Sequence, residues 1–344
     1  MDGEERYYVM NGDKKEYGTD ADRVEVRPED PYGFPFRWLC SGIIVNDVPV
    51  MKCPVKIESA TQVRKMLALP MREDDILLTG YTKSGSHWMV EILHMLTART
   101  TNYSERLKEH DQLEFINDLD SLEHDPSPRV LNTNCYMAHL PEEIAEKKVK
   151  IVHVIRNPKD VLVSMYFHMK QRAQEHFNFD NLLKGYVQDF YLYASHQFDF
   201  LRQIDQFLEA NPGHPIIHIH FEDLKRDSFA VIQELAKFLE LDASEEFLRE
   251  VADAVRFDAM KKADQDRKLP PDTFQALCGK LQIYRKGAVL AQALRYTVSL
   301  SHSVPQVSKV STLEDMDFCP PKAEETLKCS LDNTRKCAEI RSCV

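Results

Sequence analysis

A short polar loop near residue 80 carries side chains that could bind an anion. Lys83 supplies a positive charge, and Ser84 and Ser86 supply hydroxyls for a phosphate or sulfate. An apolar run precedes the loop, and apolar residues recur after it at helical spacing, which predicts a strand, a loop and a helix. Amides and the dipole at a helix N-terminus favour anions. The loop does not fit a Walker A pattern, and an ordinary turn with a surface lysine is the alternative.

A second stretch has the same organisation. The residues of 150–155 predict a buried strand, and Arg156 follows them directly. Pro158 suits the first position of the helix that comes next, and Ser164 adds a hydroxyl within that helix. Because each stretch places a cation and hydroxyls beside a helix N-terminus, the pair predicts a ligand with two separated anionic groups.

Three motifs in this order resemble those of the cytosolic sulfotransferases. Residues 81–88, Y-T-K-S-G-S-H-W, resemble the family's 5′-phosphosulfate loop, Y-P-K-S-G-T-T-W. Residues 156–164, R-N-P-K-D-V-L-V-S, resemble its 3′-phosphate motif, and residues 284–287, Y-R-K-G, resemble the start of its third motif, R-K-G-x-x-G-D-W-K. The resemblance covers about residues 30–298, and three ordered motifs are specific.

The resemblance implies a cofactor, a reaction and a fold. The cofactor is 3′-phosphoadenosine 5′-phosphosulfate (PAPS), whose sulfuryl group passes to a hydroxyl or amine of a small molecule without a metal. Lys83 is also the implied catalytic cation, at the bridging oxygen of the leaving group. The implied fold is a single α/β domain, P-loop-like, with a central parallel sheet flanked by helices. The implied cofactor-binding residues are Lys83, Ser84, Gly85, Ser86, His87, Trp88, Arg156, Ser164, Phe221, Phe257, Arg285, Lys286 and Gly287.

The family's general base is a histidine in a strand-end motif, K-T-H. Counted back from Arg156 without gaps, this histidine falls on Asn134 and the lysine falls on Asn132. An amide does not take a proton at neutral pH, and a catalytic histidine typically contributes roughly 10²–10⁴-fold. His139 is the alternative base, although in this register it is expected at the surface. The sequence therefore predicts inefficient turnover. The rival interpretation is a pseudoenzyme that binds PAPS or adenosine 3′,5′-bisphosphate (PAP) and acts as a sensor or scaffold.

The third motif and the family's dimer segment are both eroded. The G-D-W-K part of the motif falls on residues 290–293, which read L-A-Q-A. The dimer segment K-x-x-x-T-V-x-x-x-E retains only Thr297 and Val298. We therefore expect a monomer, or a dimer formed through a different surface.

The composition limits the classes of partner that the chain is expected to bind. The net charge is −11, so the surface as a whole does not attract nucleic acid, and an anionic cofactor needs a locally basic pocket. No apolar run approaches the length of a membrane span, which predicts a cytoplasmic protein without a membrane partner. His218 and His220 share a strand face, but no third metal ligand is evident.

The elements that position the motifs alternate between strand and helix. Strands are expected at 76–81, 129–133, 150–155 and 215–220, with a small hairpin within 43–50. Asp223 is expected to cap a helix over 224–241. Such alternation predicts a parallel sheet that binds ligands at the carboxyl ends of its strands. The expected organisation is a poorly ordered leader at 1–30, a sulfotransferase domain at 31–298 and a divergent tail at 299–344.

Overall fold

A computed structural model describes ten stretches of the chain. They are residues 6–11, 14–16, 42–45, 48–51, 65–105, 108, 111–116, 118–171, 175–187 and 197–266, and for the first four only the backbone is described. The predicted residues Arg285, Lys286 and Gly287, the dimer segment and the tail lie outside the described residues.

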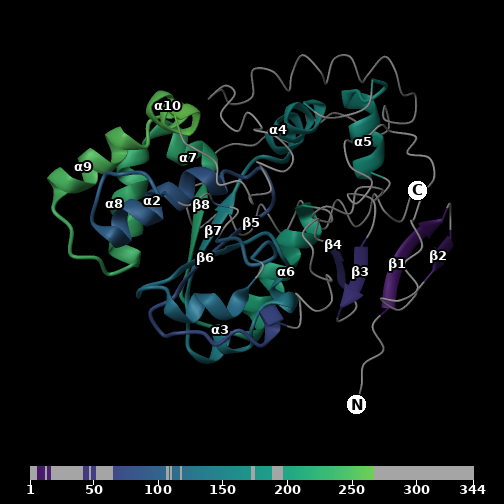
Figure 1. Cartoon of the computed structure of the whole chain (residues 1–344), viewed down its shortest axis with the longest axis horizontal. Helices are drawn as coiled ribbons and strands as arrows, with labels where there is room; N and C mark the ends of the chain where they lie inside the picture. The colour runs from purple at the N-terminus through teal and green to yellow at the C-terminus, as the bar shows by residue number, and fades with distance from the viewer. Residues whose placement is uncertain are drawn as a thin grey trace. The chain divides into compact units, whose positions relative to one another are not determined.

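A four-stranded parallel sheet forms the centre of the fold. It contains β5 (Ile76–Gly80), β6 (Val130–Thr133), β7 (Lys150–Ile155) and β8 (Ile216–His220) in the order β6-β5-β7-β8. Each neighbouring pair is parallel, so all four carboxyl ends lie at one edge (Figure 1). The predicted α/β fold with a central parallel sheet is confirmed.

Five helices pack on one face of this sheet. They are α2 (Ser86–Ala98), α7 (Phe221–Arg226), α8 (Ser228–Phe238), α9 (Glu245–Ala254) and α10 (Phe257–Asp266). The alternate strand residues Ile76, Leu78, Val152 and Val154 bury their side chains against them. This is the alternation that places every second residue of a strand on the same face.

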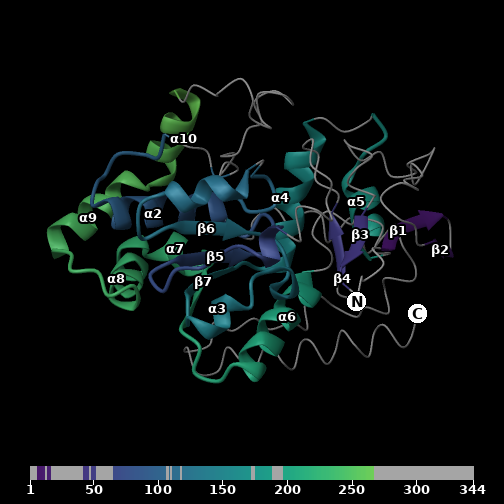
Figure 2. The same cartoon turned by 60° about the horizontal axis from the view of Figure 1, so that its bottom comes forward.

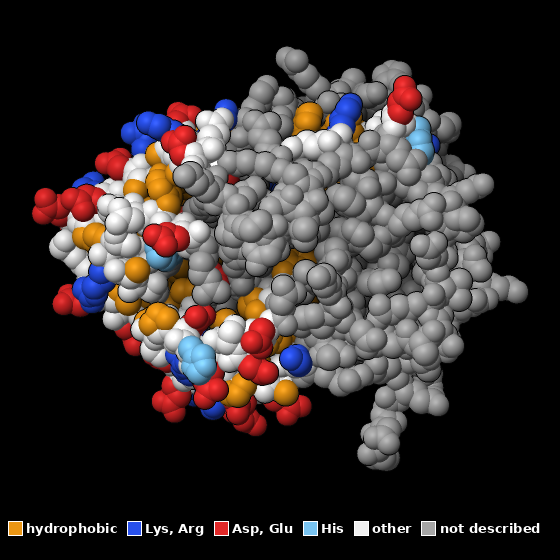
Figure 3. Space-filling view, in the orientation of Figure 1, with side chains coloured by type: hydrophobic (Ala, Val, Ile, Leu, Met, Phe, Trp, Pro, Cys, Tyr) orange, Lys and Arg blue, Asp and Glu red, His pale blue; other side chains and the backbone are white. Residues whose placement is uncertain are grey.

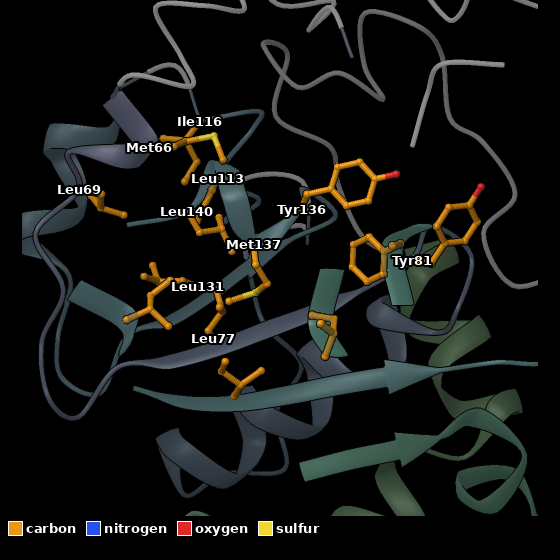
Figure 4. Packing of buried hydrophobic residues seen from close by; sticks show 14 of the residues in the cluster. Met66, Leu69, Leu77, Tyr81, Leu113, Ile116, Leu131, Tyr136, Met137 and Leu140 are labelled. Atoms are coloured by element: carbon orange, nitrogen blue, oxygen red, sulfur yellow. The ribbon is translucent and has the colours of Figure 1, made fainter. Parts of the chain in front are cut away.

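Four helices cover the opposite face, so helices flank the sheet on both sides (Figure 2). They are α3 (Glu143–Glu146), α4 (Pro158–Lys170), α5 (Phe179–Val187) and α6 (Gln197–Ala210). The 3₁₀ turns η4 (Leu119–His124) and η5 (Met137–His139) join this side. In its core, Tyr81 and Tyr136 lie at one end of the aliphatic cluster, with their hydroxyls directed away from it (Figure 4).

A second sheet is formed by the strands near the N-terminus. It contains β1 (Arg6–Asn11), β2 (Lys14–Glu16), β3 (Gly42–Val45) and β4 (Val48–Met51) in the order β2-β1-β3-β4, all antiparallel. The hairpin predicted within 43–50 is confirmed as β3 and β4. The strands β1 and β2 fall in the predicted leader, where sequence reasoning expected no strand.

The prediction that Asp223 caps a long helix is wrong. The chain forms α7 directly from Phe221, and Asp223 lies within this helix, where its carboxylate accepts a hydrogen bond from Arg226 at 2.6 Å. Asp227 caps the next helix, α8, by accepting from the amide of Ala230 at 3.0 Å. Aspartate is a preferred N-cap residue, so Asp227 could have been recognised as one. The helical pattern continues through residue 227, however, and gives no sign that α7 ends at Arg226 and a new helix begins at Ser228.

The described surface carries both signs of charge. Lys and Arg side chains alternate with Asp and Glu side chains on the face shown in Figure 3. None of the helices in the described part of the chain is long and apolar enough to cross a membrane.

Candidate functional site

The first anion loop connects β5 to α2 at the carboxyl edge of the sheet. The amide of Ser84 donates to the carbonyl of Tyr81 at 3.1 Å, which closes the turn. Lys83 and Gly85 both adopt positive φ, 66° and 115°. Gly85 is the N-cap of α2 and offers no side chain to the first helical amides. These amides are therefore directed at the space before the helix, where an anion is favoured.

Gly85 is required by the packing as well as by its φ. A Cβ at this position would lie 2.7 Å from Cδ2 of Phe221, which is closer than real Cβ contacts come. The ring of Phe221 also lies edge-on to the ring of Trp88, with centroids 5.8 Å apart. The first residue of α7 thus supports the turn that precedes α2.

The second anion loop connects β7 to α4. Pro158 is the first residue of α4, as predicted, and the side chain of Asn157 caps the helix by accepting from the amide of Lys159 at 3.0 Å. The amide of Asn157 donates to Oε1 of Glu222 at 3.0 Å. Nε2 of Gln197 donates to the carbonyl of Arg156 at 2.9 Å. Contacts from α7 and α6 therefore fix the loop on both sides.

The structure brings the two loops together through Arg156. Its Nη1 donates to the carbonyl of Lys83 at 3.0 Å. Its guanidinium carbon lies 4.1 Å from the centroid of the Phe221 ring, a stacking distance for a cation on an aromatic face. The two residues predicted from the sequence as cations, Lys83 and Arg156, are therefore in contact at the carboxyl edge of β5 and β7.

Lys225 is a further cation of this site that the sequence reasoning missed. Its ammonium lies 5.9 Å from the ring centroid of Trp88 and 5.6 Å from that of Phe257. Burial lowers the pKa of Lys225, Asp258 opposes this shift, and Arg156 adds to it. The available signal was the spacing of four residues from Phe221, which places both side chains on one face once the helix is known to start at Phe221.

Two polar atoms of the first loop and helix show that the site is suited to a ligand. Among the residues that the structure describes, Oγ of Ser84 and Nε1 of Trp88 are buried and have no hydrogen-bond partner. Buried polar groups are normally satisfied, so an unmatched hydroxyl and indole nitrogen beside two cations point to a polar anionic ligand. The other predicted residues, Ser86, His87 and Ser164, lie on α2 and α4, and Ser86 is buried.

Asn134 lies at the carboxyl end of β6, next to the first loop. Its side-chain amide donates to the carbonyl of Gly80, the last residue of β5, at 2.5 Å. Its Oδ1 accepts from Nε2 of Gln112 at 3.0 Å, and its backbone amide donates to Oε1 of Glu114 at 2.8 Å. Asn134 therefore holds two strand ends together beside the anion loop.

The expectation that His139 lies at the surface is wrong. The residue ends the short turn η5 and is 1% exposed. Its ring centroid lies 6.1 Å from that of Tyr136, and its amide donates to the carbonyl of Tyr136 at 2.9 Å. The residues between Asn134 and His139 form a compact turn that folds inward onto the apolar core, a path that sequence spacing does not reveal.

A histidine pair lies in the central strands. His153 of β7 and His218 of β8 are aligned in register, and their Nδ1 atoms are 3.0 Å apart. Burial lowers the pKa of His153 well below its ordinary value, and His218 and His220 add to the shift. No cluster of three potential metal ligands occurs within the described ranges.

Comparison with known proteins gives a family match over most of the site. A family model described as "Sulfotransferase domain" matches residues 73–288. "Sulfotransferase 1A1" of Rattus norvegicus is 28% identical over 200 residues, 55% of this chain and 67% of the relative. "Sulfotransferase 1A1" of Bos taurus is 30% identical over 207 residues, 55% of this chain and 66% of the relative. The chain thus spans about two thirds of the length of these curated relatives.

Two solved structures have a similar fold. Mouse sulfotransferase SULT7A1 complexed with PAP has a TM-score of 0.58 and 21% identity, covering 78% of this chain and 90% of that chain. Retinol dehydratase in a complex with retinol and PAP has a TM-score of 0.57 and 16% identity, covering 76% of this chain and 88% of that chain. At these sequence identities, the similarity of the two structures to this chain establishes the fold alone.

Proposed function

The chain belongs to the sulfotransferase domain family, and we propose that it transfers a sulfuryl group from PAPS to a hydroxyl or amine of a small molecule. PAPS carries anionic groups at its 3′ and 5′ ends, so it requires two separated anion sites. The loops that follow β5 and β7 supply two such sites next to each other.

The first loop fits the 5′ end of this cofactor. The uncapped amides at the start of α2 and the unmatched hydroxyl of Ser84 are donors that a phosphosulfate group can satisfy. Gly85 has no Cβ, which lets the Phe221 ring pack against the turn and hold the loop in this shape. When bound, PAPS supplies the sulfuryl group and a bisphosphate leaving group.

The second loop fits the 3′ phosphate. Arg156 provides a fixed guanidinium, which binds phosphate oxygens in a fork geometry, and Ser164 lies further along α4. We extend the 3′ site to Arg285, Lys286 and Gly287 on the basis of the sequence motif. Trp88 and Phe257 are proposed to hold the adenine. Phe221 supports Trp88, and the ammonium of Lys225 lies 5.9 Å from the ring centroid of Trp88 and 5.6 Å from that of Phe257.

Lys83 is proposed to act on the leaving group. In group transfer of this kind the protein positions donor and acceptor in line and neutralises the charge that develops on the bridging oxygen. The ammonium of Lys83 belongs to the same loop as the amides that would hold the 5′ phosphate. Asn134 would orient the acceptor, because its amide hydrogen-bonds but takes no proton.

The observation that carries this proposal is the hydrogen bond from Arg156 Nη1 to the carbonyl of Lys83. At 3.0 Å it couples the cation of one anion loop to the backbone of the other. A protein that used only one of the loops would need no such coupling. One ligand with two anionic ends explains why the two loops are joined here.

The proposal is tested by incubating the protein with ³⁵S-labelled PAPS and a panel of phenols, alcohols and amines. We expect labelled product with at least one acceptor, and loss of this product in the Lys83→Ala variant. Absence of any product from the wild type, together with tight binding of PAP, would instead support the rival function, a PAP-binding sensor or scaffold. The polar side chain of Asn134 at the acceptor edge favours that rival.

We also propose the extent of the domain, the compartment and the oligomeric state. The sulfotransferase domain spans residues 31–298, followed by a divergent tail at 299–344. The protein is cytoplasmic and acts on a small molecule, without nucleic acid or membrane as partner. It is a monomer, or a dimer through a surface other than the family's segment around Thr297 and Val298.

A further inference from the structure

The short helix α7 supplies side chains to both anion loops and carries one more cation. The guanidinium carbon of Arg156 lies 4.1 Å from the ring centroid of Phe221, the first residue of α7. Glu222 accepts from the amide of Asn157 in the second loop at 3.0 Å. Lys225 follows Phe221 by four residues, so both side chains lie on one face of the helix. The helix therefore places the ammonium of Lys225 on the same side as the ring that carries Arg156.

Two aromatic rings define the position of this ammonium. It lies 5.9 Å from the ring centroid of Trp88 and 5.6 Å from that of Phe257, and both distances are within the reach of a cation–π contact. Trp88 is in the first turn of α2, and Phe257 is the first residue of α10. These are the rings proposed to hold the adenine. The ammonium of Lys225 therefore lies at the nucleotide site, where three helices meet.

Lys225 and Arg156 are close enough for their positive charges to repel each other. Burial lowers the pKa of Lys225, Asp258 opposes this shift, and Arg156 adds to it. The nearby carboxylate of Asp223 pairs instead with Arg226, at 2.6 Å. An anion that contacts both cations would remove the repulsion and stabilise both charges.

We propose that Lys225 is a second cation of the 3′-phosphate site, where its ammonium and the guanidinium of Arg156 bind the same phosphate of PAPS or PAP. This inference rests on the proposed function of the site and adds a residue to it. Lys225 makes and breaks no covalent bond. It acts in nucleotide selection, because a nucleotide without the 3′ phosphate gives its ammonium no anion to bind at this position.

The phosphate is a better partner for this ammonium than the adenine ring is. A protonated lysine only donates, and the adenine nitrogens that could accept are uncharged. A phosphate monoester carries about −1.5 to −2 charges at pH 7, and a hydrogen bond between two charged groups is stronger than one to a neutral acceptor. The lysine stem is flexible, and its ammonium needs no fixed direction. The ammonium can therefore turn from the rings of Trp88 and Phe257 to the phosphate when the nucleotide enters.

The first test compares PAP with AMP in the Lys225→Met variant by isothermal titration. Methionine keeps an unbranched apolar chain in place of the lysine stem but removes the charge. We expect PAP to bind about tenfold or more weakly than it binds to wild type, because a charge-assisted hydrogen bond is lost. The affinity for AMP should change by less than about twofold, because its other contacts remain. Lys225→Arg keeps the charge and should restore most of the preference for PAP.

Lys170→Met is the matched control. The ammonium of Lys170 also lies near an aromatic ring, 5.2 Å from the centroid of Tyr166. Lys170 is the last residue of α4, a helix of 13 residues and about 20 Å, and the loop that carries Arg156 lies at the opposite end of this helix. Removing the charge of Lys170 should therefore leave both affinities unchanged.

Phosphorus NMR of bound PAP identifies the phosphate that the ammonium contacts. A nearby cation lowers the pKa of a phosphate, because it favours the more highly charged form. In the wild type, the 3′ phosphate should therefore titrate at a lower pH than in free PAP. In Lys225→Met, the pKa of the 3′ phosphate should rise by about half a unit or more, while the pKa of the 5′ phosphate stays as in wild type. A purely structural role of Lys225 would change both values or neither.

The outcomes separate this inference from the proposed function. If the wild type does not bind PAP, the proposed function fails and the inference fails with it. If PAP binds, but Lys225→Met prefers it over AMP as strongly as wild type does, the inference alone is overturned. Equal weakening of both nucleotides also overturns it, because the ammonium would then serve the adenine or the fold. If Lys225→Met is less stable than wild type, Lys225→Gln and Lys225→Arg make the same comparison.

Discussion

The guanidinium of Arg156 donates to the carbonyl of Lys83 at 3.0 Å while stacking on Phe221 at 4.1 Å. This relationship ties together two loops that are more than seventy residues apart in the sequence. It also uses a carbonyl next to the strained backbone of Lys83, whose φ is 66°. The arginine therefore has a structural role in the first loop in addition to its proposed role in binding phosphate.

Arg156→Lys should weaken PAP binding by about tenfold or more, although the charge is retained. A lysine lacks the planar fork that reaches the carbonyl of Lys83 and the phosphate together, and it does not stack in the same way. Isothermal titration with PAP measures the effect. Arg249→Lys is the matched control, because the guanidinium carbon of Arg249 in α9 also lies 4.1 Å from the centroid of an aromatic ring, that of Phe229 in α8. Equal losses in both variants would contradict a special role for Arg156.

Gly85→Ala should abolish the rise in melting temperature that PAP produces. The new Cβ would meet Phe221 at 2.7 Å, and the positive φ of 115° costs a further amount of about 1–2 kcal/mol. Gly213→Ala is the control, because Gly213 also has positive φ but nothing lies within 4 Å of its added Cβ. A PAP response retained by Gly85→Ala would show that the loop tolerates movement and that its shape is not required.

Much of this site follows from the sequence because its key residues are local to turns. The motifs around Lys83 and Arg156 were predicted to follow strands and precede helices, and β5, α2, β7 and α4 confirm that arrangement. Pro158 fixed the start of α4 because its ring suits the first helical position. Such signals are carried by a few neighbouring residues and need no knowledge of tertiary contacts.

The rest depends on contacts between distant segments. Lys108 and Asn134 are in contact although they are twenty-six positions apart in the sequence, and no periodicity in either segment predicts this contact. Lys225 was missed because the helix was expected to begin at residue 224, whereas α7 begins at Phe221, and only that earlier start places the two side chains on one face. His139 was misplaced because a short turn folded it inward. These features are set by packing and appear only in three dimensions.

Asn134→His should extend activity towards aliphatic alcohols. The imidazole of the variant would lie at the strand end beside the ammonium of Lys108, which lowers its pKa and keeps it neutral and able to accept a proton. Sulfation of 4-nitrobenzyl alcohol relative to 4-nitrophenol is the measurement. An unchanged ratio, with PAP binding intact, would show that a base at this position does not reach the acceptor.

His139→Ala should lower stability while leaving the ratio of phenol to alcohol sulfation unchanged. The side chain is 1% exposed and packs near Tyr136, so its removal leaves a cavity that costs about 1–3 kcal/mol. Urea unfolding gives the stability, and labelled PAPS gives the ratio. Complete loss of turnover in a folded variant that still binds PAP would identify His139 as the base instead.

The protein should lose stability as the pH falls below 6.5. Burial lowers the pKa of His153 from its ordinary 6.5, and that of His218 is lowered as well, so the unfolded chain binds more protons in this range. The stability is present above pH 6.5 and is lost as the pH falls towards the depressed values. His153→Gln should lose less between pH 7.5 and pH 5.5 than wild type in urea unfolding. The exposed His124→Gln is the control, and equal pH dependence in all three proteins would refute this assignment.

A single ligand is proposed to span both anion loops. The most direct test is isothermal titration of the wild type and Arg156→Ala with PAP and with AMP, which lacks the 3′ phosphate. We predict one site, with PAP bound at least about tenfold more tightly than AMP by the wild type. Arg156→Ala should lose this preference because the 3′ phosphate no longer finds its guanidinium. Equal affinity of the wild type for the two nucleotides, or no binding of either, would contradict the account.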